Sequence, residues 1–455
     1  MTTVESAGAT PIWFVAATAW GKTRQDIGEV ASRFADASGF KPKQGRIQLL
    51  PDASGGLAGV LFGEAAANEA EYDSLGAGKL ATALPAGDYK FASAPQNPEL
   101  AALGFLLALY RYDKFKGDRT SQPRLVHSLG LDLPGLERTA RAIAFGRDLI
   151  NTPANVLTPA ALEEEVARLA EFNGAEFESI VGDALLTHNF PLVHAVGAAA
   201  AEAPRLAQFF WGAHAAPKVT LVGKGVVFDT GGLDIKPSGA MELMKKDMGG
   251  AATALTLARF IMEAGLDIRL RVIIPIVENA ISANAMRPSD VITSRKGLSV
   301  EIGNTDAEGR LILADALAFA AEEKPDLLID FATLTGAARV ALGPDLPPFY
   351  TDDDALAADL LRAAAETADP VWRMPLWRPY DSMLESKIAD LTNSPGSPFA
   401  GSVTAALFLR RFAEGAKSWL HFDLYGWNPK PRARGPQGGE IQAARALFHL
   451  LKARY

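Results

Sequence analysis

Cysteine is missing from this sequence of 455 residues. Without cysteine the protein can hold no disulfide, no cysteine-ligated zinc finger or iron–sulfur cluster, and no cysteine nucleophile. Histidine is also scarce, with only 6 residues in the whole chain. A metal site in this protein therefore has to be built mainly from oxygen ligands.

Long apolar segments and an excess of positive charge are missing as well. The longest apolar run, 100–110, is too short for a bilayer that needs about 20 residues. Segment 11–20 could pass for a signal-peptide core, but no Lys or Arg precedes it, and its residues favour a buried strand. Lys plus Arg is 45 against 53 for Asp plus Glu, which argues against a general nucleic-acid binder. We expect a cytoplasmic protein without a membrane segment.

The residues that are present suffice for a large core, because 48% are apolar and 22% are charged. The length favours more than one domain. In the first part of the chain the patterns predict two strands and one helix, at 13–17, 58–61 and 97–110. The polar stretch 114–124 contains Gly, Ser and Pro and is typical of an exposed connection. We therefore predict a smaller N-terminal α/β domain, residues 1–130, and a larger second domain, residues 131–455.

The second domain shows a regular alternation of predicted strands and helices. Apolar and β-branched runs predict strands at 219–222, 270–277 and 327–331. Helices are predicted at 136–150, after Thr158 as N-cap with Pro159 in the first turn, and at 250–264 with Gly265 as C-cap. This order indicates an α/β domain with a central, mostly parallel sheet covered by helices. Ligands of such sheets bind at the carboxyl ends of the strands.

Several common motifs are incomplete. Gly21-Lys22-Thr23 resembles the end of a phosphate-binding loop, but Ala16 stands where that motif needs Gly. The dinucleotide fingerprint begun at 223–225 has Phe228 in place of its third glycine. The nucleophile elbow G-x-S-x-G does not occur. The basic stretch 430–434 either binds an anion or a partner or is a solvated surface loop, and we favour the loop.

Charged residues gather in segment 303–310, where the end of a strand would ordinarily be apolar. Asp306, Glu308 and Arg310 are spaced by two, so in an extended segment their side chains point to one face. Two carboxylates on one face repel each other unless a cation lies between them. A surface turn in which Arg310 neutralises one carboxylate is the alternative.

A second polar segment spans 223–250. Asp229 directly follows an apolar run, and Asp247 precedes a predicted helix, for which it could also serve as the N-cap. Lys224 and Lys236 are either exposed loop lysines or partners of these carboxylates. A lysine whose pKa is lowered by burial and a nearby metal can itself become a ligand.

Four of the carboxylates in the two segments are candidate ligands, and no histidine occurs between His214 and His421. Such a set suits two divalent ions that share carboxylates and a bridging water. The sequence therefore predicts a carboxylate-rich dinuclear site, with these members: Asp229, Asp247, Asp306 and Glu308.

The octapeptide Asn304-Thr-Asp-Ala-Glu-Gly-Arg-Leu311 resembles the signature of the leucyl aminopeptidase family, the cytosolic dinuclear metallo-aminopeptidases (peptidase family M17). Segment 223–250 is similar to that family's other metal-binding block in residue type and spacing. Segments 151–155 and 332–336 also look like family segments. The resemblance covers about residues 136–426.

The resemblance implies roles for individual residues. Asp229 and Glu308 would bridge two divalent ions (Mn²⁺ or Zn²⁺), Lys224 and Asp247 would complete the tighter site, and Asp306 the exchangeable one. Lys236 and Arg310 would be the catalytic pair, with a bicarbonate held by Arg310 and the backbone near Leu334.

The resemblance also implies an activity: hydrolysis of the N-terminal residue from peptides with a free amino terminus, by a water that bridges the two ions. It further implies a homohexamer. Two alternatives remain: a DNA-binding or structural member of the family, and another dinuclear hydrolase such as a phosphoesterase.

The family's side-chain pocket would be lined here by Met244, Thr333, Gly336, Tyr425 and Asn428. Tyr425 departs from the family, which commonly has a small residue at that position. Either Tyr425 narrows or reshapes the pocket, or it points into the core. The preference for the first residue of the substrate is therefore left open.

Overall fold

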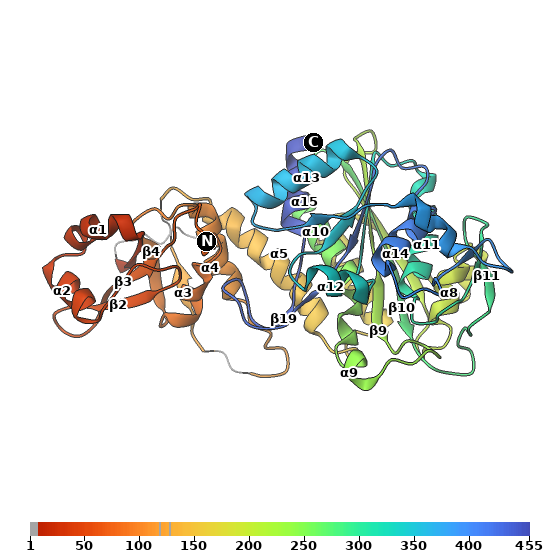
Figure 1. Cartoon of the computed structure of the whole chain (residues 1–455), viewed down its shortest axis with the longest axis horizontal. Helices are drawn as coiled ribbons and strands as arrows, with labels where there is room; N and C mark the ends of the chain where they lie inside the picture. The colour runs from red at the N-terminus through yellow and green to blue at the C-terminus, as the bar shows by residue number, and fades with distance from the viewer. Residues whose placement is uncertain (1–7, 118–119, 127–128) are drawn as a thin grey trace. The chain divides into compact units, whose positions relative to one another are not determined.

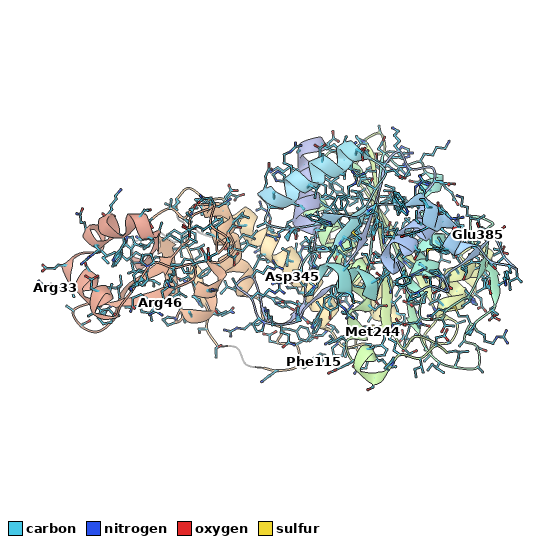
Figure 2. All side chains as sticks on the ribbon, in the orientation of Figure 1. Arg33, Arg46, Phe115, Met244, Asp345 and Glu385 are labelled. Atoms are coloured by element: carbon cyan, nitrogen blue, oxygen red, sulfur yellow. The ribbon has the colours of Figure 1, made fainter. Side chains whose placement is uncertain are left out.

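The computed structural model describes residues 8–117, 120–126 and 129–455. The chain divides into two compact units. Unit 1 comprises residues 1–144 and 430–437, and unit 2 comprises 145–429 and 438–455. Figure 1 shows both units and labels their elements, and Figure 2 draws their side chains in the same orientation. They are described in turn.

Unit 1 is built on a five-stranded sheet with the order β2-β3-β1-β4-β5. The central strand β1 pairs in parallel with β3 and β4, while β2 is antiparallel to β3. The bounds are β1 Thr10–Val15, β2 Ile47–Pro51, β3 Leu57–Gly63, β4 Gly87–Phe91 and β5 Pro123–Leu125. Residues 123–124, predicted to belong to the exposed connection, lie in β5, and residues 118–119 of that connection are outside the described residues.

Helices cover both faces of the sheet of unit 1. The helices are α1 Trp20–Asp26, α2 Glu29–Ala37, α3 Gly78–Ala83 and α4 Pro98–Ala108. On one face Ile12 and Phe14 of β1 pack in a cluster with α3 and α4, and on the other Val15 packs with α2. Strand residues alternate between the two faces, which explains why the β1 sequence is apolar at almost every position. Asn97 caps α4 by accepting the Leu100 N–H, as a helix start at Asn97 predicts.

Unit 2 contains a nine-stranded sheet with the order β15-β14-β17-β13-β8-β10-β7-β6, and β9 also pairs with β10. The inner strands β17, β13, β8, β10 and β9 are parallel, whereas β14 pairs antiparallel with β17 and β7 with both of its neighbours. The bounds are β6 Glu176–Val181, β7 Arg205–Trp211, β8 Lys218–Gly223, β9 Gly225–Asp229, β10 Arg269–Asn279, β13 Leu327–Ala332, β14 Pro348–Tyr350, β15 Trp372–Arg373 and β17 Trp419–Asp423. The predicted mostly parallel α/β sheet is thus confirmed.

The helices of unit 2 form a layer on each face of this sheet. Figure 1 shows α10, α13 and α15 on one side and α8, α11 and α14 on the other. Their bounds are α8 Pro191–Gly197, α10 Gly249–Ala264, α11 Gly309–Glu322, α13 Asp354–Glu366, α14 Gly401–Arg410 and α15 Ala444–Arg454. Both α10 and α11 are buried almost all round, because each lies between the sheet and an outer helix.

The remaining elements are short or connect the layers. They are the helices α5 Leu133–Asn151, α6 Pro159–Phe172, α7 Ala184–Thr187, α9 Ser238–Met241 and α12 Gly336–Leu342, the 3₁₀ turns η2 Ala17–Ala19, η3 Met244–Met248 and η4 Arg378–Leu384, and the strands β11 Val291–Thr293, β12 Ser299–Glu301, β16 Leu391–Thr392, β18 Trp427–Asn428 and β19 Gly438–Gly439.

The predicted helix ends are present in unit 2. Thr158 caps α6 through the Ala161 N–H, with Pro159 as the first helical residue. Gly265 ends α10 in the left-handed conformation at φ 65°, which glycine adopts without a steric cost. In the described part of the chain no helix is long and apolar enough to cross a membrane.

Two glycines allow α10 to approach the sheet closely. A Cβ on Gly250 would lie 2.1 Å from the Phe331 carbonyl oxygen of β13, and one on Gly223 would lie 2.6 Å from the Ala251 Cα. Both contacts are with backbone, which cannot swing aside. The start of α10 therefore lies directly against the carboxyl ends of β8 and β13.

Candidate metal centre and active site

The predicted site residues gather at the carboxyl ends of the parallel strands. Lys224 lies in the break between β8 and β9, and Asp229 is the last residue of β9. Asp247 lies in η3, ahead of α10, and Glu308 directly precedes α11. Residues 84 positions apart thus meet at one edge of the sheet, where a doubly covered α/β fold binds its ligands.

Lys224 is the centre of one half of the site. Its Nζ lies 2.8 Å from Asp247 Oδ2 and 2.9 Å from Glu308 Oε1, and it donates to the Thr333 carbonyl at 3.0 Å. Its side chain is 4% exposed, so the alternative of a solvent-exposed lysine is wrong. Burial favours the neutral amine, but Asp247, Glu308 and Asp229 outweigh it and raise the pKa of Lys224 above its usual value.

Lys236 plays the same part in the other half. Its Nζ lies 2.8 Å from Asp229 Oδ2 and also forms an ion pair with Asp306. The side chain is 13% exposed, so the ammonium keeps some contact with solvent. Burial opposes its charge, but the two carboxylates raise the pKa of Lys236 above its ordinary range.

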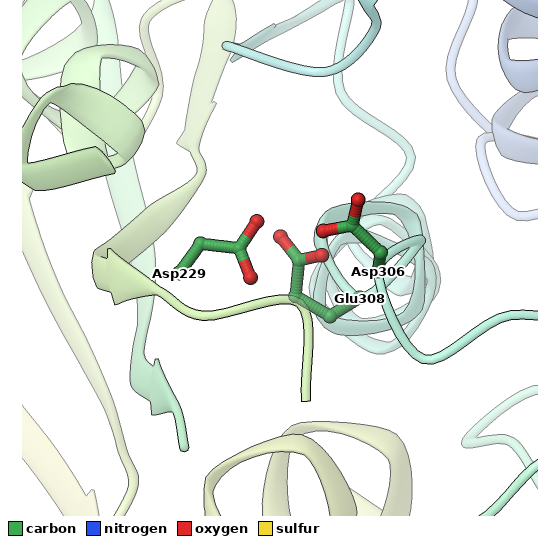
Figure 3. Close-up of side chains that lie close together, drawn as sticks. All are labelled: Asp229, Asp306 and Glu308. Atoms are coloured by element: carbon green, nitrogen blue, oxygen red, sulfur yellow. The ribbon is translucent and has the colours of Figure 1, made fainter. Parts of the chain in front are cut away.

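Three carboxylates converge between the two lysines. Figure 3 shows Asp229 and Glu308 with their carboxylates turned toward each other and Asp306 beside them. One oxygen of each lies within 4.8 Å of the others. Burial and the neighbouring carboxylates raise the pKa of Glu308 to about 8 and that of Asp306 to about 6. Such a concentration of buried negative charge is stabilised by cations.

The donor set fits divalent ions. Apart from the two lysines, no hydrogen-bond donor among the described residues reaches three buried oxygens: Asp247 Oδ2, Asp306 Oδ1 and Glu308 Oε1. Oxygen ligands are what Mn²⁺ prefers, and Zn²⁺ also accepts them. Four carboxylates are therefore available as ligands for divalent ions, and Lys224 can join them only as the neutral amine, which a bound ion favours.

The structure rejects an extended segment at 306–310 and also rejects the alternative role of Asp247 as a helix N-cap. Asp306 lies in a turn, and Arg310 lies in the first turn of α11, so segment 306–310 is not extended. The carboxylates of Asp306 and Glu308 still converge, because the chain turns into the helix between them. Asp247 is not the N-cap of α10, since Met248 holds that position and the Asp247 carboxylate instead meets Lys224.

Uncharged side chains that the sequence patterns did not single out hold the carboxylates in place. Asn279 donates to Asp229 Oδ1 at 2.8 Å, and the Gly231 N–H donates to the same oxygen at 2.9 Å. Thr333 donates to Asp247 Oδ1 at 2.8 Å. Thr305 links segment 303–310 to segment 223–250, because its hydroxyl donates to the Gly231 carbonyl. The position at the end of a strand is the only signal that could have found Asn279, whereas Thr333 was expected from the family resemblance as a residue of the side-chain pocket.

Arg310 is buried beside this cluster. One guanidinium nitrogen donates to the Asn393 carbonyl at 2.6 Å, while its Nε has no hydrogen-bond partner among the described residues. Burial lowers the pKa of Arg310 to about 10. The Leu334 N–H, expected to help bind bicarbonate, donates to Asp423 Oδ1 at 3.2 Å. Arg310 thus offers a free donor to an anion, and the role of Leu334 stays a prediction.

Tyr425 follows β17 beside the start of α10, and it is only partly buried, so it does not point into the core. The Gln442 side chain accepts from the N–H groups of Tyr425 and Gly426, both at 3.2 Å. The Lys246 ammonium lies 4.8 Å and the Arg339 guanidinium 5.3 Å from the centre of the ring. Two cations thus lie close to the tyrosine ring, and one of them, Lys246, directly precedes Asp247 in the chain.

The basic stretch 430–434 is not simply a solvated loop. It belongs to unit 1, and Arg432 and Arg434 are partly buried. A Cβ on Gly78 of α3 would lie 1.8 Å from the Ala433 carbonyl, so the stretch packs closely on this unit.

The sequence matches known families over most of its length. Residues 144–448 match the catalytic domain of the cytosol aminopeptidase family, and residues 16–128 match the N-terminal domain of M17 aminopeptidases. The chain belongs to the cytosol aminopeptidase family. It is a metal-dependent aminopeptidase, a hydrolase of the leucyl aminopeptidase type.

Relatives and solved structures agree with this assignment. The probable cytosol aminopeptidase of Syntrophotalea carbinolica is 40% identical over 375 residues, which cover 78% of this chain and 75% of the relative. The crystal structure of the cytosol aminopeptidase of Coxiella burnetii is 42% identical with a TM-score of 0.94, covering 100% of this chain and 99% of that one. The bottromycin maturation enzyme BotP in complex with Mn is 31% identical with a TM-score of 0.88, covering 98% of this chain and 100% of BotP.

Proposed function

We propose that this aminopeptidase holds two divalent ions, Mn²⁺ or Zn²⁺, on the carboxylate cluster. Asp229 and Glu308 lie centrally and would contact both ions, with Lys224 and Asp247 completing one site and Asp306 the other. The convergence of Asp229, Asp306 and Glu308 within 4.8 Å carries this proposal. The Mn complex of BotP is a further support, since that protein shares this fold.

The ions, when bound, supply an activated water and a Lewis acid for the scissile carbonyl. Lys236 has a different task. It is fixed between Asp229 and Asp306, and a lysine ammonium is protonated at neutral pH. Its ammonium can therefore donate a hydrogen bond to the oxyanion that develops on the carbonyl oxygen during hydrolysis.

Two further groups would bind and orient the reactants. The buried Arg310, with its unpartnered Nε, would hold a bicarbonate that accepts a proton from the attacking water, with help from the backbone at Leu334. The Asp247 carboxylate would bind the free α-amino group of the peptide, which restricts cleavage to the first residue.

The remaining expectations are proposals as well. The substrates are peptides with a free N-terminus, and the assembly is a homohexamer. The relatives are named cytosol aminopeptidases, which favours a cytoplasmic location. We propose no nucleic-acid or membrane partner. We propose that residues 1–130 form the N-terminal domain and that residues 131–455 form the catalytic domain.

The test uses the full chain loaded with Mn²⁺ or Zn²⁺ and a fluorogenic leucine amide. We expect cleavage that a chelator abolishes and either ion restores, and no cleavage of the N-acetylated substrate. Equal cleavage of both substrates would contradict binding of the α-amino group. Hydrolysis of a phosphodiester instead of the amide would favour the phosphoesterase alternative, and a gel shift with DNA at physiological salt would favour the DNA-binding alternative.

A further inference from the structure

Lys246 is a buried cation that the proposed mechanism does not use. Its residue is 6% exposed, in η3 directly before Asp247. Among the residues that the structure describes, its ammonium forms no ion pair and donates no hydrogen bond. Lys246 Nζ is not one of the fully buried polar atoms that lack a partner, so the ammonium keeps access to solvent and to a ligand of opposite charge. A largely buried lysine without an anionic partner marks a place where a ligand can supply the missing charge.

The charges around Lys246 are of both signs, but cations outnumber anions. Burial is the main cause that lowers the pKa of Lys246 to about 8; among the charges, Asp247 attracts the ammonium, whereas Lys224, Arg339 and Lys236 repel it. Asp247 is already engaged by Lys224 and Thr333. The ring of Tyr425 stabilises Lys246 from 4.8 Å, but a ring carries no net charge and leaves the excess of positive charge in place.

This cationic cluster, formed by Lys246, Arg339 and Tyr425, lies next to the site of the reaction. Gly249 and Gly426 bring the two segments into contact, since a Cβ on Gly249 would lie 3.6 Å from the Gly426 Cα. Lys246 and Tyr425 are chain neighbours of Asp247 and Gly426, respectively. The side chain of a substrate residue whose amine is held by Asp247 would therefore extend beside the segments that carry this cluster.

We propose that the cationic cluster binds a carboxylate on the side chain of the first substrate residue, so that the enzyme prefers amino-terminal glutamate or aspartate. This inference rests on the proposed function, because it takes the α-amino group to be held by Asp247. Lys246 supplies the main contact, since a buried ammonium is little screened by water. Arg339 is exposed and contributes less. Tyr425 positions the ammonium.

The test compares two pairs of isosteric substrates that differ in charge, glutamate with glutamine and aspartate with asparagine, and adds two apolar substrates. The metal-loaded full chain is given fluorogenic amides of glutamate, glutamine, aspartate, asparagine, leucine and methionine. We expect kcat/KM for glutamate to exceed that for glutamine by at least about tenfold, as expected for a charge-assisted hydrogen bond. The Lys246→Met variant should abolish this preference while it keeps or improves cleavage of leucine and methionine amides.

Lys245→Met is the matched control. Lys245 precedes Lys246 and carries the same charge, but its ammonium donates to the Asn151 carbonyl at 2.7 Å, away from Tyr425. The Lys245→Met variant should therefore keep the preference for glutamate. A second readout is calorimetry with the free amino acids. Glutamate should bind the unaltered chain at least about tenfold more tightly than glutamine does, whereas the Lys246→Met variant should bind glutamate and glutamine with equal affinity.

The carboxylate that the cluster binds could instead be the C-terminal carboxylate of a dipeptide substrate. Fluorogenic amides lack that group, so a charge preference seen with them comes from the side chain. If Lys246→Met instead weakens cleavage of Leu-Gly but not of Leu-Gly amide, the cluster binds the peptide terminus and our proposal is overturned. Equal kcat/KM for glutamate and glutamine also overturns it, whereas failure to cleave any amide, leucine included, contradicts the proposed function itself.

Discussion

At the scale of single residues, the site is organised by two lysines, each shared between two carboxylates. Lys224 pairs with Asp247 and Glu308, and Lys236 pairs with Asp229 and Asp306. They differ in burial, since the Lys224 side chain is 4% exposed and that of Lys236 is 13% exposed. The buried lysine suits a structural or ligand role, and the more accessible one suits contact with substrate.

Replacing Lys236 by alanine tests this division. We expect kcat to fall by about 100- to 1,000-fold, as for the loss of one oxyanion donor, with the bound metal unchanged. Metal content by elemental analysis and turnover of a leucine amide are the two measurements. Lys245→Ala is the control and should keep both. A Lys236→Ala protein with near-normal turnover would remove Lys236 from the proposed mechanism.

The chemical identity of the site could be predicted from sequence because its charged residues are clustered in two short segments. What could not be predicted was how each one is presented. Asp306 and Glu308 were considered as part of an extended segment, yet the chain turns into a helix there. Asn279, Thr333 and Gln442 lie far away in the sequence and are uncharged, so only the tertiary structure shows their contacts.

At the scale of elements, β13 and β17 are joined by a buried polar group as well as by their backbone ladder. Asp330 accepts from the Trp419 ring N–H at 2.7 Å and lies 2.6 Å from His421 Nδ1. Asp330 and His421 are fully buried. This contact fixes the register of β17, which ends two residues before Tyr425, against β13, which ends directly before Thr333.

Removing the Asp330 carboxylate should therefore be costly. We expect Asp330→Ala to lower the free energy of unfolding by about 3 kcal/mol, because buried donors on Trp419 and His421 lose their acceptor. The shift in the midpoint of urea unfolding measures this loss of stability. Asp359→Ala removes an exposed carboxylate paired with Arg362 on α13 and should cost less than about 0.5 kcal/mol. Equal effects of the two changes would contradict the role of Asp330.

The contact of α10 with the sheet gives a second prediction at this scale. Gly250→Ala should destabilise the protein by about 2 kcal/mol or more, since the new methyl group meets the Phe331 backbone. Gly336→Ala, in the first turn of α12, meets no atom within 4 Å and should be neutral or slightly stabilising. Thermal unfolding of both variants decides, and a Gly250→Ala protein as stable as the unaltered chain would contradict the close packing.

Long elements could be predicted from the sequence, whereas short ones could not. The α10 and α4 helices carry periodic apolar residues and capping signals, so their ends were predicted to within about two residues. Strands such as β15 and β18 have two residues each, too few to show any alternation. Their existence depends on neighbours that the chain reaches only after folding.

At the scale of the whole molecule, the proposed homohexamer predicts a particle mass. Six copies of a 48.3 kDa chain would give a particle of about 290 kDa, which light scattering after size exclusion measures directly. We expect this mass at micromolar concentration. A particle of one chain that retains full activity would show that the homohexamer is not needed for catalysis.

The segment 430–437 has a consequence for how the protein is made. Unit 1 begins at the amino terminus but includes this segment, whose Ala433 packs against α3. A ribosome must therefore add roughly 290 residues after residue 144 before unit 1 is complete, which takes about 15 to 60 s at 5–20 residues per second. During that interval the surface of α3 that receives Ala433 is uncovered. A gene fragment that ends at residue 144 should accordingly yield a less stable product than the same unit in the complete chain.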